Sequence, residues 1–211
     1  MGTHGRSGWS HIRLGSVAEQ IIRFSPSPVL ICRGAFKWPP QRILVPVDVK
    51  EPMDESLFMA SALTLEEKGN VELYNVITLT QYAAAGADSL IAPVDVTPIH
   101  DKITTQLKDL TLPYFETKFD VAVGEGQVAN EICRRAEQIA ADFIIIPTHG
   151  RKGLTRFLMG SVAEQVIRYA TCSVLSFCPQ KWATEQREMV KSILRDERTG
   201  FSEDTELGVV D

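Results

Sequence analysis

The spacing of apolar residues along this chain predicts short strands that alternate with amphipathic helices. Between residues 41 and 178, five apolar or alternating runs favour strands, at 42–47, 71–77, 115–123, 142–147 and 172–177. The stretches between them have the helical period and favour helices at 54–69, 99–112, 127–140 and 161–169. Such alternation is typical of a parallel sheet with helices on both faces. The pattern therefore predicts one α/β domain over 41–178.

Two regions depart from this alternation. Residues 78–98 contain glycine and prolines without a regular period, which predicts a long loop of the kind that often covers a site. Beyond the last strand, 179–211 divides into an amphipathic helix at 181–195 and a solvated acidic tail at 196–211. We expect these last segments to lie outside the α/β domain.

The beginning of the chain repeats a segment from near its other end. The sequence THGRSG at 3–8 returns as THGRKG at 148–153, and GSVAEQIIR at 15–23 returns as GSVAEQVIR at 160–168. Both matches are offset by 145 residues, with no gap between them. Because this offset is about the length of one α/β domain, it indicates a duplicated domain rather than a short repeat.

The first copy is incomplete. Residues 1–38 contain a loop, one helix at 15–24, one strand at 28–33 and the start of a linker that ends in Pro39-Pro40. Three such elements cannot bury a core of their own. We expect 1–38 to be the last third of a truncated first domain, with strand 28–33 paired antiparallel to 172–177 because an open strand edge is a liability. The alternative is a truncated tandem gene whose remnant is poorly ordered.

Composition and charge exclude several classes of partner. The chain of 211 residues carries a net charge of −5, and 196–211 alone accounts for −5, with six acidic residues and one basic residue. A neutral body with an acidic tail argues against nucleic acid or an anionic membrane as the main partner. No apolar run reaches the ~18 residues of a membrane span, and the first residues lack a signal-peptide pattern. The four cysteines form no C-x-x-C pair, so we expect reduced thiols and a cytoplasmic location.

Candidate chemistry gathers at the carboxyl ends of the predicted strands, where open parallel sheets bind ligands. Asp48 follows the first strand, and 148–161 joins the fourth strand to its helix. That segment contains three glycines and three basic residues: Gly150, Gly153, Gly160, Arg151, Lys152 and Arg156. Because Gly160-Ser161 opens a helix whose free N–H groups favour an anion, the segment predicts a phosphate cradle. Asp48 would then accept a hydrogen bond from a ribose hydroxyl or hold a hydrated cation.

The same residues also admit a purely structural interpretation. Residues 161–164 (SVAE) fit the S-x-x-E capping box, which satisfies a helix start without a ligand, and the same box occurs at 16–19. Both interpretations of this helix start remain open on the sequence. A G-x-G-x-x-A pattern at 124–129 is explained by an ordinary β–α turn. The sequence has no P-loop, no readable Ser-His-Asp arrangement and no metal-ligand spacing of histidines.

Several ordered motifs together resemble the universal stress protein family. The block Thr148-His149-Gly150, followed after nine residues by Gly160-Ser161, resembles the family signature of G-x-x-G, nine residues, Gly and then Ser or Thr. The strand ending LVPVD at 44–48 and the run from 123 to 145 match as well. The resemblance covers 41–178 as a whole domain and 1–33 as the last third of another. One position departs from the signature: its first glycine is Pro147 here, and proline has no N–H.

The resemblance implies a Rossmann-like, adenine-nucleotide hydrolase-like fold, with an open five-stranded parallel sheet of strand order 3-2-1-4-5. It also implies dimerisation through the fifth strand, which pairing with 28–33 would imitate within one chain, and ATP with Mg²⁺ as the bound cofactor. Asp48 would face the ribose, the backbone at Val76 would meet adenine, and the glycine segment would hold ribose and phosphates. The ATP-binding residues implied in this way are Pro46, Val47, Asp48, Val76, Pro147, Thr148, His149, Gly150, Arg151, Lys152, Gly153, Gly160, Ser161 and Val162.

Three functions fit these residues. The first is an ATP-binding regulatory module of the stress response, in which occupancy orders the loop at 148–160 and alters a partner surface. The second is a slow ATPase, for which the sequence offers Asp48 and His149 but no complete catalytic arrangement. The third is a nucleotide-free dimerisation scaffold in which Ser161 serves only to cap a helix.

Overall fold

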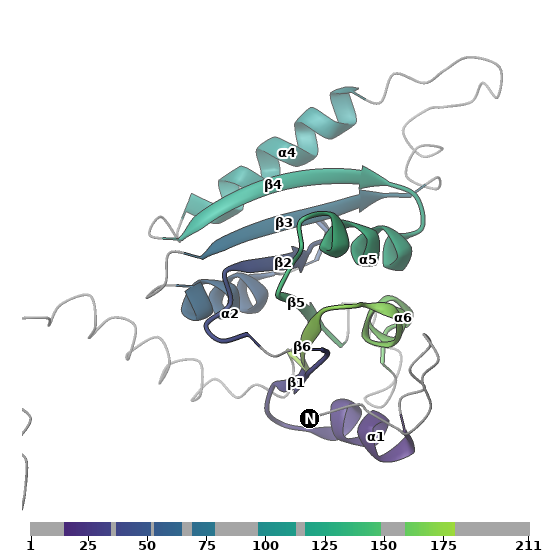
Figure 1. Cartoon of the computed structure of the whole chain (residues 1–211). Coiled ribbons are helices and arrows are strands. Elements are labelled where there is room, and N and C mark those ends of the chain that lie inside the picture. Colours follow the sequence, from purple (N-terminus) through teal and green to yellow (C-terminus); the bar gives the residue numbers. More distant parts are fainter. Residues whose placement is uncertain are drawn as a thin grey trace, which may run out of the picture.

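Six strands form one sheet in the part of the chain that the structure describes, and helices cover both faces of this sheet (Figure 1). The computed structural model describes residues 15–34, 37–51, 53–64, 69–78, 97–112, 117–148 and 159–179. Most of the loop predicted at 78–98, the helix predicted at 181–195 and the acidic tail lie outside the described residues.

Five of the strands come from the domain predicted over 41–178. They are β2 (Arg42–Pro46), β3 (Asn70–Ile77), β4 (Lys118–Glu125), β5 (Phe143–Pro147) and β6 (Ser173–Phe177), and neighbours among them are parallel. The sixth, β1 (Val29–Ile31), belongs to the first copy and lies antiparallel to β6. The order across the sheet is β1-β6-β5-β2-β3-β4. The sheet is thus mixed and six-stranded rather than five-stranded and wholly parallel: the five strands of the domain are parallel, and the first copy adds the antiparallel strand at the edge where 28–33 was expected to pair.

The helices form two layers on separate apolar cores. They are α1 (Ser16–Phe24), α2 (Asp54–Thr64), α4 (Thr97–Thr111), α5 (Val128–Gln138) and α6 (Ser161–Tyr169). Leu57 of α2 and Leu107 of α4 are buried in one core, whereas Ile22 of α1, Ile132 of α5 and Ile167 of α6 are buried in the other. The sheet is thus covered on both sides, which explains why β5 is apolar along its whole length.

Most predicted boundaries agree with the structure to within two residues, but β4 begins and ends later than expected. Gly124 suggested that the strand had ended, yet it pairs with Val76 inside the sheet. A Cβ atom at position 124 would lie 1.9 Å from the hydroxyl oxygen of Tyr74. The glycine therefore marks the close approach of a side chain and not a turn.

The strands β1 and β6 pair antiparallel, as expected for these segments of the two copies. The paired residues are Val29 with Ser176, Leu30 with Leu175 and Ile31 with Val174. Leu30 and Leu175 occupy equivalent positions of the 145-residue repeat, so the register is symmetric about this pair. Contacts between identical subunits around a two-fold axis have the same symmetry. The chain makes such a contact within itself.

Arg33 fastens the first segment to the complete domain. Its backbone N–H donates to Ser173 Oγ at 3.1 Å, and its guanidinium donates to the carbonyl oxygens of Ile167 and Arg168 at the end of α6. The last carbonyls of a helix lack intrahelical donors and favour a positive charge. Arg33 is only 9% exposed, and this burial lowers the pKa of its guanidinium.

The described helices and the thiols bear on location and redox chemistry. None of the helices in the described ranges combines the length and the hydropathy needed to cross a membrane. All four cysteines are free. Burial raises the pKa of Cys133 to about 11 and that of Cys172 to about 12, so both thiols stay protonated and slow to react near neutral pH.

Replacing Arg33 by methionine is expected to lower the free energy of unfolding by about 1–3 kcal/mol, because the carbonyl groups at the end of α6 lose a buried donor. Arg23→Met is the matched control, since Arg23 forms an ion pair with Glu19 along α1 that is worth about 0.3–0.5 kcal/mol. Urea unfolding followed by circular dichroism measures both losses. Equal losses in the two variants would contradict the fastening role of Arg33.

Candidate functional site

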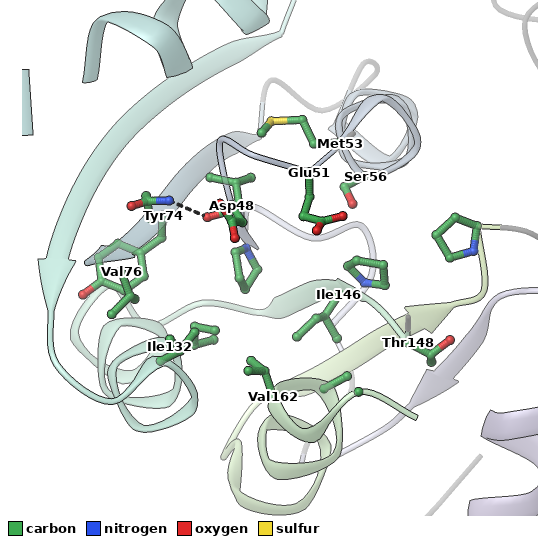
Figure 2. A pocket seen from close by; sticks show the side chains of 18 of the residues that line it. Asp48, Glu51, Met53, Ser56, Tyr74, Val76, Ile132, Ile146, Thr148 and Val162 are labelled. Atoms are coloured by element: carbon green, nitrogen blue, oxygen red, sulfur yellow. Dashed lines mark hydrogen bonds between the residues drawn. The ribbon is translucent and has the colours of Figure 1, made fainter. Parts of the chain in front are cut away.

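A cavity of about 530 Å³ opens at the carboxyl ends of β2, β3 and β5, beside the amino ends of α5 and α6 (Figure 2). The central strands β2 and β5 pair at Ile43–Phe143 and Leu44–Ile144 and separate beyond these residues. The chain continues from β2 to α2 on one face of the sheet and from β5 to α6 on the other. Open parallel sheets bind ligands at such a point of divergence.

Nine of the fourteen residues predicted for the site line this cavity. They are Pro46, Val47, Asp48, Val76, Pro147, Thr148, Gly160, Ser161 and Val162. In Figure 2, Asp48 and Val76 lie on one side of the cavity, and Val162 and Thr148 lie on the other. The remaining five, His149, Gly150, Arg151, Lys152 and Gly153, lie outside the described residues.

Asp48 emerges where β2 leaves the sheet. Val47 still donates its N–H to the carbonyl of Tyr74 at 2.9 Å, and its own carbonyl accepts a bond from Asn75 Nδ2 at 2.8 Å. The chain then turns, because the Asp48 carboxylate accepts the N–H of Lys50 at 3.0 Å. The Asp48 side chain is exposed at the mouth of the cavity. Its position thus depends on hydrogen bonds at the very end of the β2–β3 ladder.

Thr148 and Gly160 hold the two ends of the glycine segment together. The Thr148 N–H and hydroxyl both donate to the Phe177 carbonyl, at 2.7 and 3.1 Å. The Gly160 N–H donates to the Thr148 carbonyl at 2.7 Å. Thr148 is 1% exposed, so its hydroxyl anchors the segment to β6. These bonds bring the start of α6 against the end of β5.

The start of α6 has no side-chain cap. Its N-cap residue is Gly160, in extended conformation, and Ser161 is the first helical residue. The capping-box interpretation of 161–164 is therefore wrong, and α1 likewise begins after Gly15 without a side-chain cap. The first N–H groups of a helix have no intrahelical acceptor and favour an anion. At α6 these groups belong to Ser161, Val162 and Ala163, all of which line the cavity.

Sequence reasoning missed the wall that β3 and α5 contribute. Tyr74 and Ile132 lie on the same side of the cavity as Val76 (Figure 2). The strand period could have indicated Tyr74, since residues two apart share a face of the sheet. No local pattern indicates Ile132, because its approach depends on how α5 packs. The other lining residues that were missed are Glu51, Met53, Glu55, Ser56, Asn75, Thr78, Val128, Ile146, Ala163, Phe177 and Pro179.

Tyr74 is held in place by groups from three directions. Its hydroxyl lies 3.4 Å from Glu131 Oε2, and the guanidinium carbon of Arg135 lies 5.9 Å from its ring centroid. Arg135 is itself fixed by two hydrogen bonds of 2.7 Å to the carboxylate of Glu72. Burial, together with the negative charge of Glu131, raises the pKa of the Tyr74 hydroxyl. With Gly124 beneath its hydroxyl, the ring forms a fixed edge of the cavity.

The charged side chains among the described lining residues are all acidic. They belong to Asp48, Glu51 and Glu55. These carboxylates do not form a metal site by themselves, since the described residues contain no group of three or more possible His, Cys, Asp or Glu ligands. The site therefore offers helix N–H groups on one side and carboxylates on the other, around apolar walls.

Comparison with known proteins identifies the family. The sequence model of the universal stress protein family matches residues 1–33 and 40–177, and the chain belongs to this family. The universal stress protein E homolog of Haemophilus influenzae is 30% identical over 173 residues, covering 77% of this chain and 55% of that protein. Universal stress protein Rv2005c of Mycobacterium tuberculosis is 27% identical over 184 residues, covering 83% and 59%.

Some relatives match over shorter segments. Universal stress protein MJ0531 of Methanocaldococcus jannaschii is 55% identical over 51 residues, which are 24% of this chain and 30% of that protein. The chain thus spans between about a third and three fifths of the length of these three relatives.

Solved structures support the fold. A functionally unknown protein from Pseudomonas aeruginosa, PA1789, has a TM-score of 0.59 and 22% identity, covering 84% of this chain and 61% of that one. A universal stress protein from Archaeoglobus fulgidus has a TM-score of 0.53 and 22% identity, covering 84% and 59%. At this level of identity the likeness concerns the fold alone.

Gly124→Ala is expected to lower the free energy of unfolding by about 1–3 kcal/mol, because the added methyl group would overlap the Tyr74 hydroxyl and force the ring to move. The test is a double-mutant cycle with Tyr74→Leu, measured by urea unfolding. Once the ring is gone, the same glycine substitution should cost much less. An identical loss in both backgrounds would mean that the ring does not depend on Gly124.

Proposed function

We propose that this universal stress protein binds ATP with Mg²⁺ in the cavity between β2, β3, β5 and α6, and acts as a nucleotide-dependent regulatory module in the stress response. One observation carries the proposal: the N–H groups of Ser161, Val162 and Ala163 open onto the cavity without a side-chain cap. A helix start of this kind is suited to a phosphate group. The nucleotide-free scaffold needed Ser161 as a cap, and that cap is not formed.

The walls of the cavity suggest how the nucleotide lies. Val76, Tyr74 and Ile132 form an apolar side that suits the base. Asp48 is an exposed acceptor for a ribose hydroxyl, and the amino end of α6 takes the phosphates. A volume of about 530 Å³ falls within the range of small-molecule pockets, about 300–1,000 Å³.

Charge favours the magnesium complex over the free nucleotide. The described lining carries three carboxylates, and a triphosphate is strongly negative. Because like charges in one cavity repel, Mg²⁺ bound to the phosphates offsets part of this repulsion. Arg151, Lys152 and Arg156, outside the described residues, add positive charge to the glycine segment.

The proline in the family signature is compatible with this arrangement. Pro147 has no N–H, and the next N–H, that of Thr148, is bonded to the Phe177 carbonyl. A glycine at 147, as in the family signature, would add one backbone N–H at the end of β5 that proline does not supply. Phosphate binding then rests on α6 and on the glycine segment.

The first copy bears on assembly. We infer that 1–38 corresponds to the last third of a universal stress domain with its linker, that 41–178 is a whole domain, and that 179–211 is a further segment after it. Because β1 occupies the outer edge of β6, a homodimer through that strand would require β1 to leave. The segment 1–38 thus takes the place of a partner strand. Separately, we infer that the protein is cytoplasmic and that an adenine nucleotide is its main ligand.

Gly160→Val should weaken ATP binding at least about tenfold without unfolding the domain. The new Cβ would lie 3.4 Å from the Thr148 carbonyl oxygen, an ordinary contact, so the fold should tolerate it, and because Gly160 lines the cavity a branched side chain would take up space at the helix start. Gly15→Val is the matched control, because Gly15 is the equivalent N-cap of α1 and has open space around it. Isothermal titration calorimetry with Mg-ATP compares the variants. Unchanged affinity in Gly160→Val would contradict the phosphate cradle.

ATP binding should also depend on magnesium. We expect a thermal shift with Mg-ATP that falls sharply when EDTA removes the metal, since the carboxylates then repel the free triphosphate. Nucleotide released on denaturing the purified protein gives an independent measure. A nucleotide-free preparation with no Mg-ATP shift would overturn the proposal. Phosphate release in a single turnover would instead favour the slow ATPase.

A further inference from the structure

Asn75, near the end of β3, has a buried side-chain amide of which only the nitrogen forms a hydrogen bond. The side chain is 3% exposed, and its Nδ2 donates to the Val47 carbonyl at 2.8 Å. Its Oδ1 is buried and has no hydrogen-bond partner in the described part of the chain. The amide orientation is fixed by the bond to Val47, because only the nitrogen can donate to a carbonyl.

An amide in this position is unfavourable for stability alone. A buried carbonyl oxygen without a donor destabilises a fold, and leucine has nearly the same size without that oxygen. The strand around it is apolar on both sides, with Val76 and Ile77 buried. The reason for an asparagine is therefore found in its N–H group and in what that group does to Val47.

The bond to Val47 replaces a backbone bond of the sheet. In a parallel ladder in which Val47 donates to Tyr74, the Val47 carbonyl would accept the N–H of Val76. In the described part of the chain this carbonyl accepts the Asn75 side chain and no backbone N–H. Val76 follows Tyr74 by two residues, so its N–H points to the β2 side of β3, and Val76 lines the cavity. The Asn75 side chain thus occupies the carbonyl oxygen that the Val76 N–H would otherwise bind.

We propose that Asn75 is a positioning residue for the base: by occupying the Val47 carbonyl, it leaves the Val76 N–H as a hydrogen-bond donor for N1 of adenine. This inference rests on the proposed ATP site and deepens it. The same bond holds the end of β2 and hence Asp48, which follows Val47. N1 of adenine is an acceptor, whereas N1 of hypoxanthine carries a hydrogen, so this donor selects adenine.

Asn75→Leu tests the proposal through base selectivity. The wild-type protein is expected to bind Mg-ATP at least about tenfold more tightly than Mg-inosine triphosphate. In Asn75→Leu the Val47 carbonyl becomes available to the Val76 N–H, and the preference should shrink to about twofold or less. The melting temperature should stay the same or rise, because the unpartnered Oδ1 is gone.

Asn75→Asp separates positioning from stability. It keeps the size of the side chain and removes the donor, so the preference for ATP should shrink as in Asn75→Leu, whereas the melting temperature should fall because a carboxylate faces a carbonyl. Asn70→Leu is the control, since Asn70 lies at the far end of β3 and its Nδ2 bonds to Asp120. That variant should keep the wild-type preference.

The outcomes distinguish this inference from the function it rests on. If the wild-type protein binds neither nucleotide, the ATP proposal fails and the role of Asn75 fails with it. If it binds ATP but both Asn75 variants keep the full preference, only the role of Asn75 is overturned. Hydrogen exchange at the Val76 amide gives a second measurement on the ligand-free proteins: exchange should be slower in Asn75→Leu, and equal rates in the two proteins would overturn the proposal.

Discussion

The separation of β2 from β5 is the constraint on which the cavity depends. The two central strands share a parallel ladder through Leu44 and Ile144 and then diverge, because their following helices lie on opposite faces of the sheet. Pro46 and Pro147 both stand near this point, and neither can extend a ladder with an N–H. The polar groups around the cavity thus come from the segments that leave the sheet here: carboxylates after β2 and backbone N–H groups at the start of α6.

The hydrogen bonds at this point divide the backbone donors into two sets. The Thr148 N–H is bonded to the Phe177 carbonyl of β6, and the Gly160 N–H is bonded to the Thr148 carbonyl. The first turn of α6 has no such partner, because its N-cap is a glycine and no side chain caps it. The phosphate groups of the proposed ligand would meet the donors that remain. The donors that remain lie one element further along the chain than Pro147, which has no N–H of its own.

The sequence predicted the elements well, because each strand and helix has its own period and the sheet is covered on both faces. The same local sequence did not predict burial: Val166 in α6 is 0% exposed, whereas Ile21, its equivalent in α1, is 42% exposed. The difference arises because α5 packs against α6 in the complete copy, and packing between elements is not encoded locally. For the same reason the motif residues of the site were found, whereas Tyr74, Asn75 and Ile132 were not.

The two copies of the repeat share the part of the proposed site that would hold phosphate. Both carry the glycine segment and the helix start with a glycine N-cap. In the complete copy, Asp48, Asn75 and Val76 line the cavity opposite this helix start. A helix start binds an anion weakly unless other groups fix the rest of the ligand. For the proposed nucleotide, the strand ends opposite the glycine segment are therefore expected to contribute as much as the segment itself.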